Sequence, residues 1–250
     1  MDSPLRDMKI KLINGDCLEE MKKIADGSVD LVLTDPPYGT TACKWDIVIP
    51  FEPMWEQLKR VTKKNGAIVL FGSQPFTSAL VMSNPKMFKY EWVWEKSKAT
   101  GFLNSKIMPL ISHENINVFY DKTPTYNAQK KDGEPYHKGI EKRREVGTYH
   151  QFNGGQELKN ETGKRFPRTV LYFKTAEKEG KFHPTQKPLA LMEYLIKTYT
   201  NEGETVLDFA AGSGTIGVAC QNTKRNFILI EKEEKYCEIA RRRLAQHPLI

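Results

Sequence analysis

The chain has 250 residues, which is long enough for one large α/β domain with a buried core. Its 38 Lys and Arg residues outnumber its 31 Asp and Glu residues, and the net charge of +7 is compatible with a polyanionic partner without requiring one. No apolar run approaches the roughly 20 residues that span a bilayer, and the N-terminus lacks the apolar segment of an export signal. These features exclude fibres and miniproteins and predict a soluble, cytoplasmic protein without a membrane partner.

The cysteines indicate neither a metal site nor a disulfide framework. The four are far apart and form no Cys-x-x-Cys pair: Cys17, Cys43, Cys220 and Cys237. Zinc sites and disulfide scaffolds both need clustered or regularly spaced cysteines. We therefore predict reduced intracellular thiols and no bound metal.

The first part of the chain alternates between strand and helix patterns. Short apolar runs predict strands at 10–13, 29–33 and 67–71, and helical spacing predicts helices that begin at Asp16, at Pro53 and after Pro75. Alternation of this kind is typical of a parallel sheet covered by helices.

The stretch from Thr34 to Gly39 follows the buried strand at 29–33 and reads Thr-Asp-Pro-Pro-Tyr-Gly. Its two prolines fix φ and donate no N–H, so the stretch offers mainly acceptors, with the carboxylate of Asp35 and the ring of Tyr38 at the strand's end. Such a platform suits a flat ring that carries an amino group, as a nucleobase does. A Pro-rich turn without function is the alternative.

The middle of the chain changes character. Strands are predicted at 90–94 and 111–120, but residues 121–168 contain no long periodic segment. Aromatic residues are interleaved with cations there, which favours a nucleic-acid surface over a solvated insertion. The candidate DNA contacts are Lys130, Lys131, Lys142, Arg143, Arg144, Lys164 and Arg165.

Order returns after residue 168. Strands are predicted at 169–173, 205–209 and 227–230, with helices that begin at Pro188, after the glycine-rich turn at 210–217 and after Glu231. The turn contains a literal Gly-x-Gly-x-x-Gly, formed by Gly212, Gly214 and Gly217, which is the fingerprint of dinucleotide-binding proteins.

The position of this fingerprint argues against a nicotinamide-dependent oxidoreductase. Only one strand and one helix follow Gly217. In dinucleotide-binding domains the fingerprint normally stands at the start of a βαβαβ unit, which forms half of the domain. The strand before Asp35 must therefore belong to the same sheet in a permuted order, with both strands ending at one edge. The carboxylate of Asp208 beside the turn favours a cationic adenosyl ligand, such as S-adenosylmethionine, over a pyrophosphate.

With Asp35-Pro36-Pro37-Tyr38 early and the segments 183–188 and 208–214 late, the chain resembles the amino-group DNA methyltransferases of the permuted β class. The resemblance implies an α/β, Rossmann-like fold with a mostly parallel sheet and helices on both faces. It divides the chain into a catalytic part (1–120), a variable target-recognition insertion (121–168) and a cofactor-binding part (169–250).

The resemblance also implies roles for individual residues. Asp35 and the Pro36 carbonyl would accept hydrogen bonds from a flipped base on which Tyr38 stacks, and Pro37 completes this catalytic motif. The residues implied to bind S-adenosylmethionine are Asp16, Cys17, Asp35, Thr185, Lys187, Asp208, Phe209, Ala210, Gly212, Ser213, Gly214 and Glu231. Within this set, Asp16 and Cys17 would lie near the adenine, Glu231 would hold the ribose, and Thr185 and Lys187 would contact the methionine end. One departure is Ala211, which stands where the family often has a glycine.

An initial Asp in the tetrapeptide resembles the adenine-N6 enzymes, so we expect adenine-N6 methylation of double-stranded DNA. Cytosine-N4 methylation is the first alternative. An oxidoreductase and a non-catalytic nucleic-acid-binding protein are further alternatives. The sequence leaves open whether the protein forms a homodimer and whether a cognate restriction endonuclease accompanies it.

Overall fold

The computed structural model describes residues 9–41, 43, 45–140, 157–176, 180, 182 and 185–246. The chain divides into a larger unit, Met1–Asn127 with Thr169–Ile250, and a smaller unit, Ala128–Arg168. The expected insertion begins earlier, at residue 121, but Asn127 still donates its backbone N–H to the Thr198 carbonyl of the larger unit at 2.7 Å. The role of the insertion in target recognition stays a prediction.

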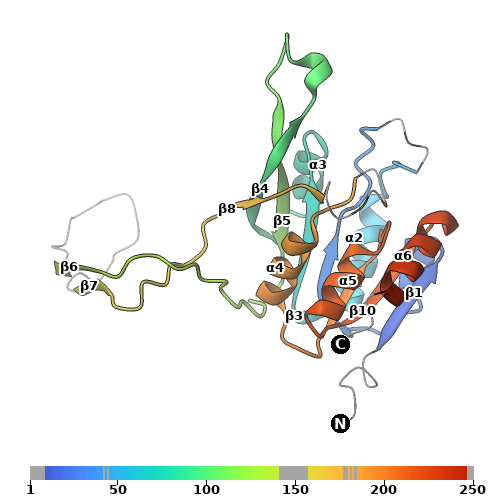
Figure 1. Ribbon diagram of the computed structural model, residues 1–250. Helices are drawn as coiled ribbons and strands as arrows, with labels where there is room; N and C mark the ends of the chain where they lie inside the picture. Colours follow the sequence, from blue (N-terminus) through green and yellow to red (C-terminus); the bar gives the residue numbers. More distant parts are fainter. Residues whose placement is uncertain are drawn as a thin grey trace. The chain divides into compact units, whose positions relative to one another are not determined.

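Eight strands of the described chain form one sheet in the larger unit (Figure 1), in the order β1-β10-β9-β2-β3-β5-β4-β8. Their bounds are β1 Ile10–Asn14, β2 Val29–Thr34, β3 Thr62–Gly72, β4 Phe88–Thr100, β5 Ile111–Phe119, β8 Val170–Phe173, β9 Thr205–Asp208 and β10 Asn226–Glu231. All neighbouring strands run parallel except where β5 pairs antiparallel with β3 and β4. The predicted mostly parallel sheet is confirmed.

The permuted order is confirmed by the neighbours at the centre of the sheet. Strand β2 pairs in parallel with β9, which comes more than 170 positions later, with Leu31 opposite Val206 and Val32 opposite Leu207. Parallel strands end at the same edge. The segments that follow Thr34 and Asp208 therefore meet at one edge of the sheet.

Helices cover both faces of the sheet, because its central strands are apolar on both sides. The helices are α1 Cys17–Met21, α2 Phe51–Val61, α3 Phe76–Ser83, α4 Leu189–Tyr199, α5 Thr215–Asn222 and α6 Glu234–Gln246. In β2, Leu31 and Leu33 pack in a core with α4 and α5, whereas Val32 packs in a second core with α1, α2 and α3. Among the described helices, none is long and apolar enough to cross a membrane.

Two predicted boundaries around α2 were wrong. Helix α2 begins at Phe51 with Pro50 as its N-cap, so Pro53 lies inside the first turn and not at its start. Proline is tolerated there because the first backbone N–H groups of a helix have no partner within the helix. The helix ends at Val61 and β3 starts at once at Thr62, five residues before the strand predicted at 67–71.

Strand β4 extends well beyond its predicted range of 90–94. Its second half pairs with β5 as far as Thr100 opposite Ile111, and the short 3-10 helix η1, Phe102–Asn104, lies in the connection. This half reads Glu-Lys-Ser-Lys and lacks the apolar alternation by which a half-buried strand is predicted.

The smaller unit contains a two-stranded antiparallel sheet of β6, Tyr136–Ile140, and β7, Glu157–Asn160. An isolated antiparallel bridge joins Lys131 to Arg165.

Candidate active site

A cavity of about 1270 Å³ lies where β1, β2, β9 and β10 end. It brings together nearly all of the residues predicted for catalysis and cofactor binding. The predicted residues that line it are Asp16, Cys17, Asp35, Pro36, Pro37, Tyr38, Thr185, Lys187, Asp208, Phe209, Ala210, Gly212, Ser213 and Glu231. Gly214 is the exception and lies behind the lining. The individual roles of these residues stay predictions.

The motif after β2 is held as a rigid unit. The Tyr38 hydroxyl donates to Oδ1 of Asp35 at 2.5 Å, and the Tyr38 ring stacks on Phe76 with the centroids 5.0 Å apart. Pro36 and Pro37 restrict the backbone between them. The Asp35 carboxylate is therefore fixed at the cavity wall by its own motif.

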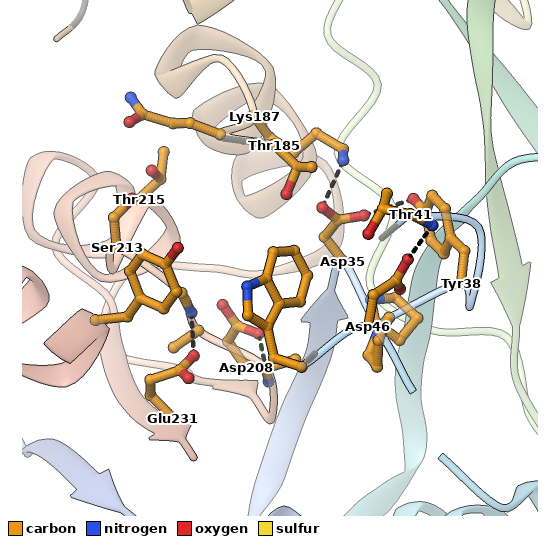
Figure 2. A pocket seen from close by; sticks show the side chains of 18 of the residues that line it. Asp35, Tyr38, Thr41, Asp46, Thr185, Lys187, Asp208, Ser213, Thr215 and Glu231 are labelled. Carbon is orange, nitrogen blue, oxygen red and sulfur yellow. Dashed lines mark hydrogen bonds and ion pairs between the residues drawn. The ribbon is translucent and has the colours of Figure 1, made fainter. Parts of the chain in front are cut away.

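A row of alternating charges continues from Asp35, and Figure 2 shows its first contact, between Asp35 and Lys187. The Lys187 ammonium lies 2.5 Å from Oδ2 of Asp35 and 3.2 Å from Oε2 of Glu114, and Lys96 lies 3.4 Å from Oε1 of Glu114. All four side chains are largely shielded from solvent. Sequence reasoning missed Glu114 and Lys96, because nothing in the strands that carry them marks a functional position.

The pKa values follow from this arrangement. Burial raises the pKa of Asp35, Lys187 opposes that change and Glu114 adds to it. The pKa of Lys187 is raised, since Asp35 and Glu114 outweigh the opposing effect of burial. One lysine thus lies between two carboxylates, which favours its charged form.

Asp46 closes the loop that follows the motif. Its carboxylate accepts the backbone N–H groups of Gly39, Thr40 and Thr41 at 2.7 to 2.9 Å. Desolvation would raise the pKa of Asp46, but hydrogen bonds from the Thr41 side chain and these three amides lower it overall. Asp46 is thus an ionised anchor that fixes the segment after Tyr38. In the sequence it is marked only as an acid in a polar stretch.

The glycine turn after β9 is built by backbone donors and carboxylate acceptors. The N–H of Ala210 donates to Asp208 at 3.2 Å, and the N–H of Gly212 donates to Glu231 at 2.6 Å. Gly214 has φ +76° and a Cβ on it would lie 2.8 Å from the Cβ of Ala240, so this position requires glycine. Gly214 supports the turn from behind, which explains why it does not line the cavity.

At this turn, hydrogen bonds only partly offset the effect of burial on the two carboxylates, Asp208 and Glu231. Burial raises the pKa of Asp208 to about 8, with smaller opposing effects from the Ala210 amide and the Thr34 side chain, and neighbouring Glu231 and Asp35 raise it further. Burial also raises the pKa of Glu231. The wall around Asp208 is therefore suited to a cationic group, which would favour the ionised carboxylate.

An aromatic pair lies in the wall of the cavity. The rings of Trp45 and Tyr236 meet edge to face with the centroids 6.4 Å apart, and both residues line the cavity, as does Cys17. Burial raises the pKa of Cys17 to about 11, so its side chain is a neutral thiol at physiological pH. This wall offers flat, apolar surface and no nucleophilic thiolate. The sequence did not reveal the pairing of Trp45 with Tyr236.

A buried guanidinium supports the glycine turn from α6. Nη1 of Arg243 donates to the carbonyl oxygen and the hydroxyl of Ser213 at 2.8 and 2.9 Å and to the Thr215 hydroxyl at 3.0 Å. The guanidinium also lies over the ring of Phe182, 4.6 Å from its centroid. Both Ser213 and Phe182 line the cavity, so Arg243 fixes two parts of its wall without reaching it.

The predicted DNA contacts lie in the smaller unit. There the ammonium of Lys130 lies 4.5 Å from the centroid of Phe166, and the guanidinium of Arg165 lies 4.7 Å from that of Tyr136. Lys164 forms an ion pair with Asp132. Lys142, Arg143 and Arg144 lie outside the described residues. Contact of these cations with DNA stays a prediction.

Across the described ranges, no three His, Cys, Asp or Glu side chains are grouped so that they could hold a metal ion.

Known proteins match this chain along most of its length. The family model described as DNA methylase (N6_N4_Mtase) matches residues 29–242. The DNA adenine methyltransferase YhdJ of Escherichia coli (strain K12) is 31% identical over 263 residues, which cover 93% of this chain and 82% of that relative. The type II methyltransferase M.HpaI of Haemophilus parainfluenzae is 28% identical over 256 residues, which cover 95% of this chain and 74% of that relative.

Solved structures share the fold. The structure of M1.HpyAVI in complex with SAM has a TM-score of 0.66 and 26% identity, and the match covers 94% of this chain and 98% of that one. The PvuII DNA methyltransferase, named as cytosine-N4-specific, also has a TM-score of 0.66, but with 15% identity and coverage of 91% and 83% it shows the fold alone. The family match and the relatives agree with the permuted sheet and the shared cavity: the chain belongs to the DNA methylase family.

Proposed function

We propose that this DNA methylase transfers a methyl group to the N6 amino group of adenine in double-stranded DNA. The observation that carries the proposal is the single cavity shared by the Asp35 motif at the end of β2 and the Asp208 turn at the end of β9. An acceptor platform and a site for a cationic donor would thereby lie within one reaction volume, where orientation supplies much of the rate.

S-adenosylmethionine is the methyl donor. When bound, it supplies an electrophilic methyl group on a sulfonium. The residues of the cavity fit it, since Asp208 is a buried carboxylate whose pKa is raised by burial and by acidic neighbours. Asp208 and Glu231 would hold its charged and hydroxylated parts, and the wall of Trp45, Tyr236 and Cys17 offers apolar surface for its adenine.

Asp35 would receive the amino group of the target base. Tyr38 and Lys187 each use one lone pair of its carboxylate, and an ionised carboxylate has about four acceptor positions, so acceptor capacity remains. The amino nitrogen of adenine is a poor nucleophile because its lone pair is delocalised into the ring. Hydrogen bonds to Asp35 and to the Pro36 carbonyl would favour a pyramidal nitrogen and stabilise the charge that develops during transfer.

The target base must leave the helix, since a paired amine inside a duplex cannot reach a recessed carboxylate. Adenine is favoured over cytosine by the initial Asp of the motif and by the name of the 31% identical relative, a DNA adenine methyltransferase. Cytosine N4 is the second candidate, because it is also an exocyclic amine and an enzyme named for it shares the fold.

Target recognition by residues 121–168 is part of the same proposal, as are a homodimer and a companion restriction endonuclease. The last is supported by relatives that are named type II methyltransferases.

The test is expression in a host that lacks DNA methylation, followed by single-molecule sequencing of its DNA. We expect N6-methyladenine at one sequence motif, and no modification when the Asp35→Ala variant is expressed at the same level. Modification at cytosine would replace the first candidate by the second, and a fully active Asp35→Ala variant would remove Asp35 from the mechanism.

A further inference from the structure

The hairpin of β4 and β5 carries an exposed apolar tip. Leu103 is 96% exposed, Ile107 83%, Phe102 78% and Met108 46%. In Figure 1 the two strands rise away from the rest of the sheet, and this tip lies at their end. Contiguous apolar side chains at such exposure are costly in water and mark an interaction site.

The tip is an ordered structure with its own hydrogen bonds. Gly101 adopts φ +89° and opens η1, and the Asn104 carbonyl accepts the N–H groups of Ile107 and Met108 at 3.0 Å each. The Ser105 N–H donates to the Phe102 carbonyl at 3.1 Å. The turns therefore hold the apolar side chains outward and little ordering is needed when they are buried by a partner.

The charge of the hairpin favours a polyanionic partner. Residues 96–113 contain no Asp or Glu but three lysines, of which Lys98 and Lys106 are exposed. A surface that pairs with a second copy of this basic hairpin would bring like charges together, whereas DNA phosphates would neutralise them. Double-stranded DNA is thus the occupant that the composition supports.

The stem of the hairpin belongs to the wall of the candidate active site. Lys98, Ala99, Thr100 and Ile111 line the same cavity as Asp35. Thr100 and Ile111 are also the last residues that pair in the hairpin, so the tip begins where the cavity wall ends. DNA that delivers a base to Asp35 would have to lie next to this tip.

We propose that the tip enters the duplex at the target base pair and that Leu103 and Phe102 fill the space left by the flipped base. The inference rests on the proposed function, because it requires a base to leave the helix. Apolar side chains wedged between base steps replace part of the lost stacking. The hairpin would thus stabilise the flipped state, while Asp35 acts on the base that has left.

The test compares Leu103→Ser and Phe102→Ser with the control Met82→Ser, an exposed methionine on α3 that is 71% accessible. Each protein is assayed on a duplex with the sequence motif found by sequencing, and on the same duplex with an abasic site opposite the target base. We expect a loss of at least about tenfold in duplex methylation for the hairpin variants, most of it regained on the abasic duplex, where flipping is less costly. Binding of S-adenosylmethionine and the Met82→Ser control should match the wild type.

Wild-type rates for both hairpin variants would overturn the inference, and so would an equal loss on both substrates. A change from dimer to monomer in sedimentation, with duplex methylation intact, would assign the tip to a second copy and overturn it as well. If the wild-type protein methylates no duplex, the proposed function fails separately. DNA affinity then decides the role of the hairpin, with a weakening of at least about fivefold expected for Leu103→Ser and none for Met82→Ser.

Discussion

Lys187 contacts Asp35 at 2.5 Å although 152 positions separate them in the chain, and its ammonium also lies 3.2 Å from Glu114. The Lys187 ammonium lowers the pKa of Asp35, and the Glu114 carboxylate raises it. The acceptor that we assign to the target base is therefore controlled by a residue from a distant segment of the chain.

Two substitutions should shift the pH dependence of catalysis in opposite directions. In Lys187→Met, Asp35 loses the cation that lowers its pKa. The acidic limb of the profile of kcat against pH should therefore move to higher pH, by about 1 pH unit or more. In Glu114→Gln, Asp35 loses a carboxylate that raises its pKa, so the acidic limb should move to lower pH.

The pH dependence of kcat at saturating substrate measures both shifts. Loss of one partner of a buried pair costs about 3–5 kcal/mol of stability, so thermal melting must first establish that Lys187→Met is folded at the assay temperature. Shifts of the two variants in the same direction would contradict a control of Asp35 by this pair.

Asp208 should take part in proton release when S-adenosylmethionine binds. Its pKa of about 8 in the free protein means that the carboxyl is mostly protonated at pH 7, and a nearby cationic ligand would favour the ionised form. Calorimetry at pH 7 in buffers of different ionisation enthalpy should detect this release in the wild type and less of it in Asp208→Asn. The variant should also bind the ligand at least about tenfold more weakly. If the two proteins release the same number of protons on binding, Asp208 does not belong to the ligand site.

The same carboxyl should make the ligand-free protein less stable as the pH rises. The folded pKa of Asp208 lies above its ordinary value of 3.8, so the unfolded chain releases this proton first. The contribution of Asp208 to stability is full below 3.8 and is lost as the pH rises to about 8. As the pH rises across this window, the melting temperature of the wild type should therefore fall relative to that of Asp208→Asn. A difference that does not change with pH would contradict the assignment.

The sequence predicted the parts of the site that depend on local pattern. The strands before Asp35 and Asp208 are continuous apolar runs bounded by turn residues, and parallel strands must end at one edge. The segments after these two strands, which come from opposite ends of the chain, were therefore expected at one edge of the sheet, and both line the same cavity.

Partners from other strands could not be predicted in this way. Glu114 reaches Lys187 from β5, and its position depends on the antiparallel register of β5 against β3 and β4. Arg243 supports Ser213 through the packing of α6, which its helical spacing does not specify. Long-range register and helix packing are set by the whole core, so a reading of local pattern missed both residues.

Gly214 and Gly203 form a matched pair that separates backbone strain from a steric clash. Their φ values are +76° and +80°, but a Cβ at Gly214 would lie 2.8 Å from Ala240, whereas a Cβ at Gly203 has no neighbour within 4 Å. Gly203→Ala should lower the free energy of unfolding by about 1 kcal/mol, and Gly214→Ala by about 1–3 kcal/mol more. Chemical denaturation measures both values. Only Gly214→Ala should also weaken binding of S-adenosylmethionine, and equal effects of the two substitutions would show that Ala240 does not restrict the turn.

Arg243 should act on cofactor binding through the glycine turn. Replacing it by Met removes hydrogen bonds to Ser213 and Thr215 and leaves their oxygens without a charged donor, so the turn should lose order. Hydrogen bonds to charged groups contribute about 1.5–3 kcal/mol each, and we expect the KM for S-adenosylmethionine to rise at least about tenfold, while kcat at saturation changes little. Arg242→Met is the control, because it removes the same charge from the preceding position, where the side chain is 77% exposed. A fall in kcat without a change in KM would assign Arg243 to the chemical step, and equal KM values for the two variants would show that net charge alone is responsible.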